Sequence, residues 1–182
     1  MKSTIRKRTW KSIYRLLDKV SPLSYDCGKL CGAICCTCSN ITDEDMGIYL
    51  YPGEEKLHSK NDKWLDWSGE NAEDYDFPNS WQGKVYFVKC TTPPNCPRGK
   101  RPFQCRTFPL APYIDQSGCF QLVYNYEILP YSCPLIDGDY RIEESFYKAT
   151  FTVWTHLLRD PLIFDLVEYE SRKWDQRMEE KY

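Results

Sequence analysis

The sequence has no long apolar run and no recognisable secretory leader. A transmembrane helix needs about 18 consecutive apolar residues, and no stretch of this chain approaches that length. A leader has an unbroken apolar core of about 7–15 residues, whereas charged residues interrupt every apolar cluster between positions 1 and 20. We therefore expect a cytoplasmic protein without a transmembrane segment, in a reducing compartment where stable disulfides are rare.

Also absent are an excess of positive charge and the short motifs of common enzyme classes. Lys and Arg number 24 against 26 Asp and Glu, so the formal net charge is -2 and nothing is left over to neutralise a nucleic-acid backbone. The chain contains no phosphate-cradling glycine loop, no nucleophile elbow and no HExxH motif. We thus expect no nucleic-acid binding, and the sequence identifies no catalytic residue.

Positive charge is nevertheless concentrated at the N-terminus. The first nineteen residues carry one carboxylate, Asp18, against Lys2, Arg6, Lys7, Arg8, Lys11, Arg15 and Lys19. Residues 9–20 also place apolar side chains at steps of three and four, which predicts a helix. The charged face of such a helix is either simply solvated or in contact with a membrane surface or an acidic partner.

Cysteine is what the chain has in abundance. Thiols that stay reduced in a cytoplasm commonly bind metal, and disulfides are the alternative if a leader has been removed. The ten cysteines form a group that is close in sequence and a group that is dispersed: Cys27, Cys31, Cys35, Cys36 and Cys38, then Cys90, Cys96, Cys105, Cys119 and Cys133. Zinc takes thiolates in tetrahedral sets of four, so this count is enough for more than one site.

The adjacent pair Cys35–Cys36 restricts how the thiols are shared. Neighbouring side chains on a regular backbone point in different directions, so the pair either serves two ions or reaches round one cluster. Eight ligands would then form two four-thiolate sites, or one cluster with thiols to spare.

The periodicity of the chain predicts an α+β fold in one domain, residues 1–182. We expect a small cysteine-rich β unit, with a hairpin from runs 106–114 and 119–128, between N-terminal and C-terminal helices. The metal-binding core would span about 27–134 and the helical C-terminal region about 142–182, with Asp160 as the N-cap of its last helix. A capping-box pattern at residues 42–45 predicts a further helix to about Tyr51, and a strand is expected at 84–89. Residues 54–79 are expected to be irregular, with at most one short helix or strand.

Two cysteine blocks resemble those of a known family. The segment CGKLCGAICC, followed downstream by CPRGKRPFQCRTFP and a final Cys-Pro, is similar to the YkgJ-type cysteine-cluster family, a zinc- or iron-chelating domain. The resemblance covers roughly residues 27–134, and it implies a metal-ligand set of Cys27, Cys31, Cys35, Cys36, Cys90, Cys96, Cys105 and Cys133. Cys38 and Cys119 are additional to the family pattern, and the first block is spaced C-x3-C-x3-CC where C-x2-C-x2-CC is more usual.

Several functions are compatible with this ligand set. The first is a protein that binds zinc or iron in closed thiolate sites, as a structural ion or as cargo. The second is an iron–sulfur enzyme or redox protein, because flagellin lysine methylases carry a similar cysteine domain. A third is a thiol redox sensor that uses Cys38 or Cys119. In the first two of these functions, Arg101 and Arg106 either donate hydrogen bonds to the sulfur of a ligand or pair with surface carboxylates.

Overall fold

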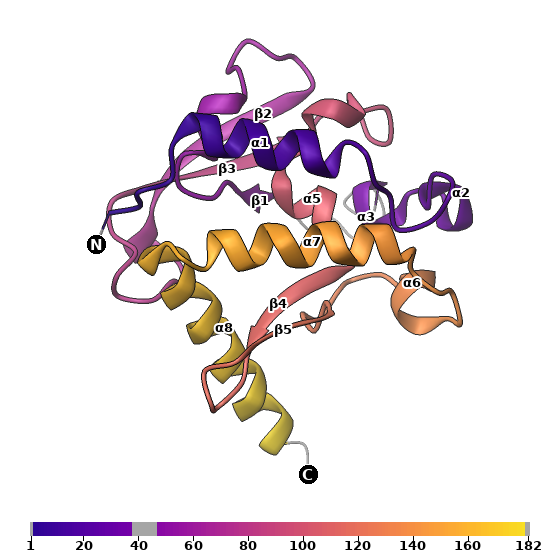
Figure 1. Ribbon diagram of the computed structural model, residues 1–182. Helices are drawn as coiled ribbons and strands as arrows, with labels where there is room; N and C mark the ends of the chain where they lie inside the picture. The colour runs from indigo at the N-terminus through magenta and orange to yellow at the C-terminus, as the bar shows by residue number, and fades with distance from the viewer. Residues whose placement is uncertain (1, 38–46, 181–182) are drawn as a thin grey trace.

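Three long helices surround two small antiparallel sheets in the computed structural model, which describes residues 2–37 and 47–180 (Figure 1). The long helices are α1 (Lys7–Leu17), α7 (Glu144–Leu157) and α8 (Pro161–Glu179). The first sheet has the order β1 (Ile48–Tyr49), β3 (Lys84–Cys90), β2 (Leu65–Asn71), and the second is the hairpin of β4 (Leu110–Ile114) and β5 (Phe120–Tyr124). The predicted α+β fold with N-terminal and C-terminal helices is confirmed.

Short helical turns make up the rest of the regular structure. They are α2 (Gly28–Cys31), α3 (Ile34–Thr37), α5 (Phe103–Thr107) and α6 (Pro134–Asp137), with three 3-10 turns, η1 (Glu54–Leu57), η2 (Ala72–Asp74) and η3 (Arg98–Lys100). The cysteine-rich segment that follows residue 26 is therefore partly helical. Its turn at Gly32, with φ +64°, uses the left-handed backbone conformation that glycine adopts without strain.

The long helices follow the sequence pattern closely. The buried face of α1 consists of Trp10, Ile13, Tyr14 and Leu17, as its spacing predicts. At the start of α8, the Asp160 carboxylate accepts hydrogen bonds from the backbone N–H groups of Leu162 and Ile163, at 3.2 and 3.4 Å. The predicted N-cap is thus confirmed, and Pro161 occupies the first helical position.

Three local predictions were wrong or too long. Residues 54–79, expected to hold at most one short helix or strand, contain η1, β2 and η2. The expected helix from residue 42 to about Tyr51 begins outside the described residues, and its described end is strand β1, in which Ile48 and Tyr49 pair with Val88 and Phe87. The hairpin is confirmed but shorter than predicted, because Arg106 and Thr107 belong to α5. Ile128, the last residue of the predicted second run, is 79% exposed beyond the end of β5.

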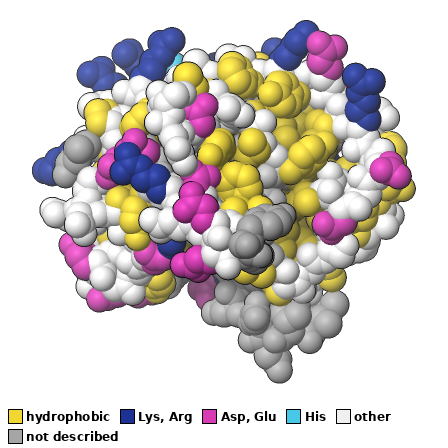
Figure 2. Space-filling view, turned by 90° about the horizontal axis from the view of Figure 1, so that it is seen from below, with side chains coloured by type: hydrophobic (Ala, Val, Ile, Leu, Met, Phe, Trp, Pro, Cys, Tyr) yellow, Lys and Arg dark blue, Asp and Glu magenta, His cyan; other side chains and the backbone are white. Residues whose placement is uncertain are grey.

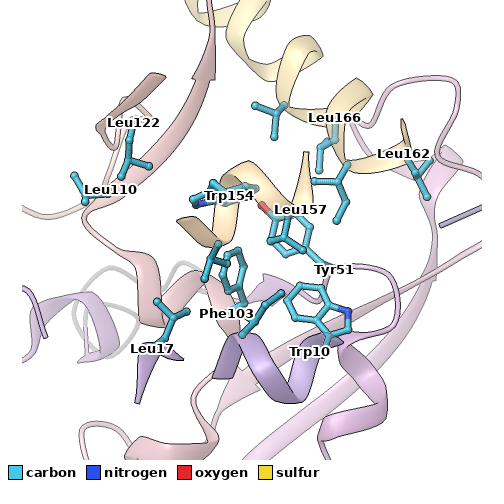
Figure 3. Packing of buried hydrophobic residues seen from close by; sticks show 14 of the residues in the cluster. Trp10, Leu17, Tyr51, Phe103, Leu110, Leu122, Trp154, Leu157, Leu162 and Leu166 are labelled. Atoms are coloured by element: carbon cyan, nitrogen blue, oxygen red, sulfur yellow. The ribbon is translucent and has the colours of Figure 1, made fainter. Parts of the chain in front are cut away.

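Aromatic side chains from four segments meet in the centre of the core (Figure 3). Phe103, which is fully buried, lies with its ring centroid 5.5 Å from Trp10, 5.6 Å from Tyr51 and 5.1 Å from Trp154. These are edge-to-face geometries that add to the gain from burying apolar surface. Phe103 is the first residue of α5, so the core holds in place the short helix that carries Cys105.

The surface is mixed. In the view of Figure 2, hydrophobic side chains cover a broad area of one face, with acidic side chains around it and Lys and Arg mainly near its edges. Within the described residues, no helix is long and apolar enough to cross a membrane.

Candidate functional site

The cysteine-bearing segments gather at one end of the molecule. The short helices α2, α3 and α6 lie beside the C-terminal end of α1 and the N-terminal end of α7 (Figure 1). Specific contacts hold this end together: the backbone N–H of Glu143 donates to the carbonyl of Pro22 at 2.9 Å, and the Arg98 guanidinium is 2.7 Å from the Asp26 carboxylate. Segments that are distant in sequence therefore meet just before α2.

A first thiol group consists of Cys27, Cys31 and Cys133. Cys133 is buried with Leu23 and Leu135, and Cys27 packs against this small cluster. Desolvation raises the pKa of the Cys27 thiol, and nearby Asp26, Cys31 and Cys133 raise it further. The same mutual effect reaches Cys133, whose pKa is raised by desolvation and by Cys31. These three thiols, from α2 and from the start of α6, are thus electrostatic neighbours.

A second thiol group consists of Cys36, Cys90, Cys96 and Cys105. Cys90, the last residue of β3, and Cys96 pack against the same apolar side chains, which are Leu50, Trp64, Leu65 and Val88. Desolvation raises the pKa of Cys90, and Cys96 and Cys36 raise it further. Desolvation, Cys36 and Cys96 likewise raise the pKa of Cys105, to about 12. The four thiols therefore come from three separate segments of the chain.

The Cys35–Cys36 pair connects the two thiol groups. Their sulfur atoms are 3.9 Å apart, and a hydrogen bond from Cys35 lowers the pKa of Cys36 while raising that of Cys35. The charge of Arg101 also favours the thiolate form of Cys36. The pKa of Cys35 is raised by Cys105, from the second thiol group, and by Cys27, from the first. Cys35 thus lies between the two groups.

The two arginines of the second cysteine block have different roles. Nε of Arg101 donates a hydrogen bond to Sγ of Cys96 at 3.0 Å, so of the two alternatives Arg101 has the contact with sulfur. The Arg106 side chain is only 5% exposed and pairs with the Asp18 carboxylate at 2.6 Å. It also donates to the backbone carbonyls of Arg101 and Gly99, so it stiffens the loop that presents Arg101.

A buried carboxylate behind Cys105 was not predicted. Glu54 is fully buried, and its Oε1 accepts hydrogen bonds from the Tyr14 hydroxyl and from the backbone N–H of Phe103, both at 2.6 Å. Its Oε2 accepts from the backbone N–H of Tyr51 at 3.0 Å. Because the first N–H groups of a helix lack internal partners, Glu54 completes the start of α5. In the sequence Glu54 belongs to a charged run after Pro52-Gly53, a pattern typical of a surface turn, so no local signal reveals its burial.

The remaining candidate ligands lie elsewhere. Cys119 is exposed in the turn between β4 and β5, and Figure 1 places that turn away from α2, α3 and α6. Cys38 lies outside the described residues. His58 is buried and its Nε2 is 3.0 Å from the Tyr14 hydroxyl, whereas His156 is exposed on α7.

The thiol groups do not form a closed metal site by themselves. In residues 2–37 and 47–180, no three side chains of His, Cys, Asp or Glu form a group that could hold a metal ion as they stand. All the described cysteines are free thiols. Comparisons with protein-family models, with curated proteins and with solved structures found no match to this chain. Membership of the YkgJ-type family therefore stays a prediction.

Proposed function

We propose that this chain is a metal-binding protein that holds two zinc or iron ions, each in a site of four thiolates. The first site would use Cys27, Cys31, Cys35 and Cys133, and the second would use Cys36, Cys90, Cys96 and Cys105. The division follows the two thiol groups, with Cys35 assigned to the group that otherwise has three members. Adjacent Cys35 and Cys36, whose sulfur atoms are 3.9 Å apart, would then serve different ions.

The observation that carries the proposal is the gathering of eight thiols from four segments at one end of the fold. Uncharged thiols have no strong mutual attraction, and desolvation disfavours their thiolates, as the raised pKa values of Cys27, Cys90 and Cys133 indicate. A divalent ion would reverse this effect, because a coordinated thiol is deprotonated. An all-thiolate donor set suits zinc or iron rather than magnesium or calcium.

Metal binding would also complete the folding of this end of the molecule. A preformed site rarely exists without its ion, so the binding free energy draws the ligands together, and structural zinc sites contribute on the order of 10 kcal/mol. Arg101 would then supply a fixed positive charge and one hydrogen bond to the Cys96 sulfur, offsetting part of the negative charge of four thiolates. The role of the ions is structural or that of cargo, and the compartment we propose is the cytoplasm, where the thiols stay reduced.

The test is elemental analysis of protein purified without oxygen, together with its visible spectrum and its content of labile sulfide. We expect two ions per chain and no labile sulfide. The variants C105S and C133S should each lose one ion and keep the other, because they remove ligands of different sites. C119S is the matched control, since it changes an exposed thiol outside both groups and should keep both ions.

A cobalt titration covers the case in which a ligand variant fails to fold. Co²⁺ in a tetrahedral thiolate site has characteristic visible bands, so the wild-type chain should reach its end point at two equivalents. Full metal content in C105S and in C133S would remove these residues from the ligand set. A brown protein with labile sulfide, which loses all its iron in either variant, would replace the two-site proposal with a single iron–sulfur cluster.

A further inference from the structure

The outward face of α1 is a continuous line of unpaired positive charge. Arg8, Lys11 and Arg15 follow one another at steps of three and four, which places them on one side of α1. Lys19 continues the spacing in the turn after the helix ends at Leu17, and all four are exposed. The opposite side of α1 is buried in the core through Trp10, Ile13, Tyr14 and Leu17. Among the described residues no carboxylate pairs with any of the four cations, and Asp18, the acidic residue of this segment, is bound to Arg106. We call these four residues the α1 basic face.

The charges of this face repel one another along the helix, although Arg15 in the last turn complements the helix dipole. Like charges four residues apart, as in Lys11–Arg15 and Arg15–Lys19, repel each other. The first turn of α1 has no acidic residue and no side-chain cap, although positive charge at a helix N-terminus opposes the helix dipole. The other long helices use the opposite arrangement, with Glu144–Lys148 in α7 and Glu168–Arg172 in α8 paired at the same spacing. A helix face needed only for solubility would be more stable with the same kind of ion pairs.

From this arrangement we propose that the α1 basic face docks on an anionic lipid bilayer. The face belongs to a single exposed helix, so a flat charged surface can reach all four cations at once. The aromatic residues of α1, Trp10 and Tyr14, are buried and unable to stack on nucleic-acid bases. The chain beyond residue 19 carries 17 Lys and Arg against 25 Asp and Glu, so attraction to a plane of negative charge orients the molecule with α1 toward it.

The attachment is electrostatic and therefore reversible. The apolar side of α1 is already used in the core, so the helix does not insert its hydrophobic face as amphipathic membrane helices do. Each Lys or Arg near an anionic bilayer strengthens binding about fivefold, and the attraction falls off within a Debye length of about 10 Å at 0.1 M salt. Binding should therefore depend strongly on ionic strength.

The test is co-sedimentation of the full chain, as purified, with vesicles of phosphatidylcholine alone or mixed with phosphatidylserine. The wild type should sediment with the mixed vesicles at low salt, remain free with pure phosphatidylcholine, and be released as salt is raised. The variant K11Q/R15Q/K19Q should bind roughly 100-fold more weakly, because it loses three charges. The control R141Q/K148Q/R172Q has the same net charge, loses three exposed cations elsewhere, and should bind like the wild type.

Two further measurements separate this proposal from its rivals. The melting temperature of K11Q/R15Q/K19Q should stay close to that of the wild type, because the repulsion relieved along α1 offsets the lost interaction of Arg15 with the helix dipole. Equal vesicle binding by both triple variants, or binding that persists at high salt, would overturn the proposal. Binding of the wild type to duplex DNA or to polyglutamate, without binding to the mixed vesicles, would assign the α1 basic face to another kind of partner.

Discussion

The guanidinium of Arg101 donates a hydrogen bond to the sulfur of Cys96 at 3.0 Å, and Arg101 also favours the thiolate form of Cys36. One side chain thus acts on two thiols of the same group, by a hydrogen bond to the sulfur of Cys96 and by its charge on Cys36. A contact of this kind with a metal ligand typically changes metal affinity by about 10–100-fold. The backbone at Arg101 is also held in place, because the buried Arg106 side chain donates a hydrogen bond to the carbonyl oxygen of Arg101.

We therefore predict that R101Q lowers the affinity of the second site about tenfold and leaves that of the first nearly unchanged. The measurement is competition for zinc with a chromophoric chelator, which resolves the two binding steps. The control is K100Q, which removes the same charge one residue away from a side chain that pairs with Asp62 on the surface. Equal losses in R101Q and K100Q would mean that net charge, and not the hydrogen bond to sulfur, determines the affinity.

Glu54 joins three segments through one carboxylate, so its substitution should destabilise the fold. In E54Q one carboxylate oxygen becomes an NH₂ group, which faces an N–H or O–H donor and cannot accept its hydrogen bond. We expect E54Q to lower the free energy of unfolding by about 2 kcal/mol, measured by urea denaturation. E55Q is the matched control, since its side chain lies on the surface beside Lys56, and it should change the stability by less than about 0.5 kcal/mol. Equal stabilities of E54Q and E55Q would contradict the role assigned to Glu54.

The contrast between Asp160 and Glu54 explains how much of this structure could be predicted from the sequence. Asp160 caps the helix that begins at the next residue. The Asp-Pro signal is local, so the sequence alone predicts this cap. Strand β1 has only two residues, and it exists because Val88 and Phe87 pair with it from forty residues away. Glu54 is buried because Tyr14, Tyr51 and Phe103 meet around it. Such dependence on distant partners leaves no trace in the local pattern.

The candidate site could likewise be predicted only in part from the sequence. Adjacent Cys35 and Cys36 indicated from the sequence that the thiols are shared between two ions or within one cluster. Which distant cysteines join each of them depends on packing: Leu23 and Leu135 hold Cys133, while Leu50 and Val88 hold Cys90 and Cys96. The sequence also left open whether each arginine contacts sulfur or a carboxylate. Only the folded chain shows that Arg101 has the first role and Arg106 the second.

The shifted pKa values predict the order in which thiols react in the metal-free protein. The thiolate is the nucleophile, so Cys36, whose pKa is lowered mainly by the hydrogen bond from Cys35, should be alkylated before Cys105, whose pKa is raised to about 12. Access to the whole residue predicts the reverse, because Cys105 is the more exposed of the two residues even though desolvation acts on its thiol. The measurement is brief labelling with iodoacetamide at pH 7, followed by peptide mass spectrometry.

The variant C35A identifies the cause of this order. Alanine removes the hydrogen bond to the Cys36 sulfur, so the pH at which Cys36 becomes reactive should rise. C119A, which changes a thiol distant from the pair, should leave it unchanged. Faster labelling of Cys105 than of Cys36 in the metal-free wild type would contradict the assigned shifts.

Glu170 on α8 should make the stability of the fold depend on pH. Desolvation raises the pKa of this carboxyl group from 4.5 to about 7, although the Tyr49 hydroxyl donates a hydrogen bond to it at 3.1 Å. Between these two pKa values the folded chain binds the proton more tightly than the unfolded chain does. The stability that the proton provides is therefore present below pH 4.5 and is lost as the pH rises through 7. The loss is at most about 3.5 kcal/mol, at about 1.4 kcal/mol for each pH unit of the shift.

We predict that E170Q is more stable than the wild type at pH 8 and that the difference shrinks toward pH 5, because glutamine stays neutral throughout. Urea denaturation of both proteins across this range, at a fixed excess of zinc, measures the difference and cancels the pH dependence that the thiols share. The control is E168Q, which changes a carboxylate in the same turn of α8. Glu168 pairs with Arg172 near the surface, so E168Q should show no such trend. A constant difference between E170Q and the wild type from pH 5 to pH 8 would show that the Glu170 carboxyl group does not titrate in this range.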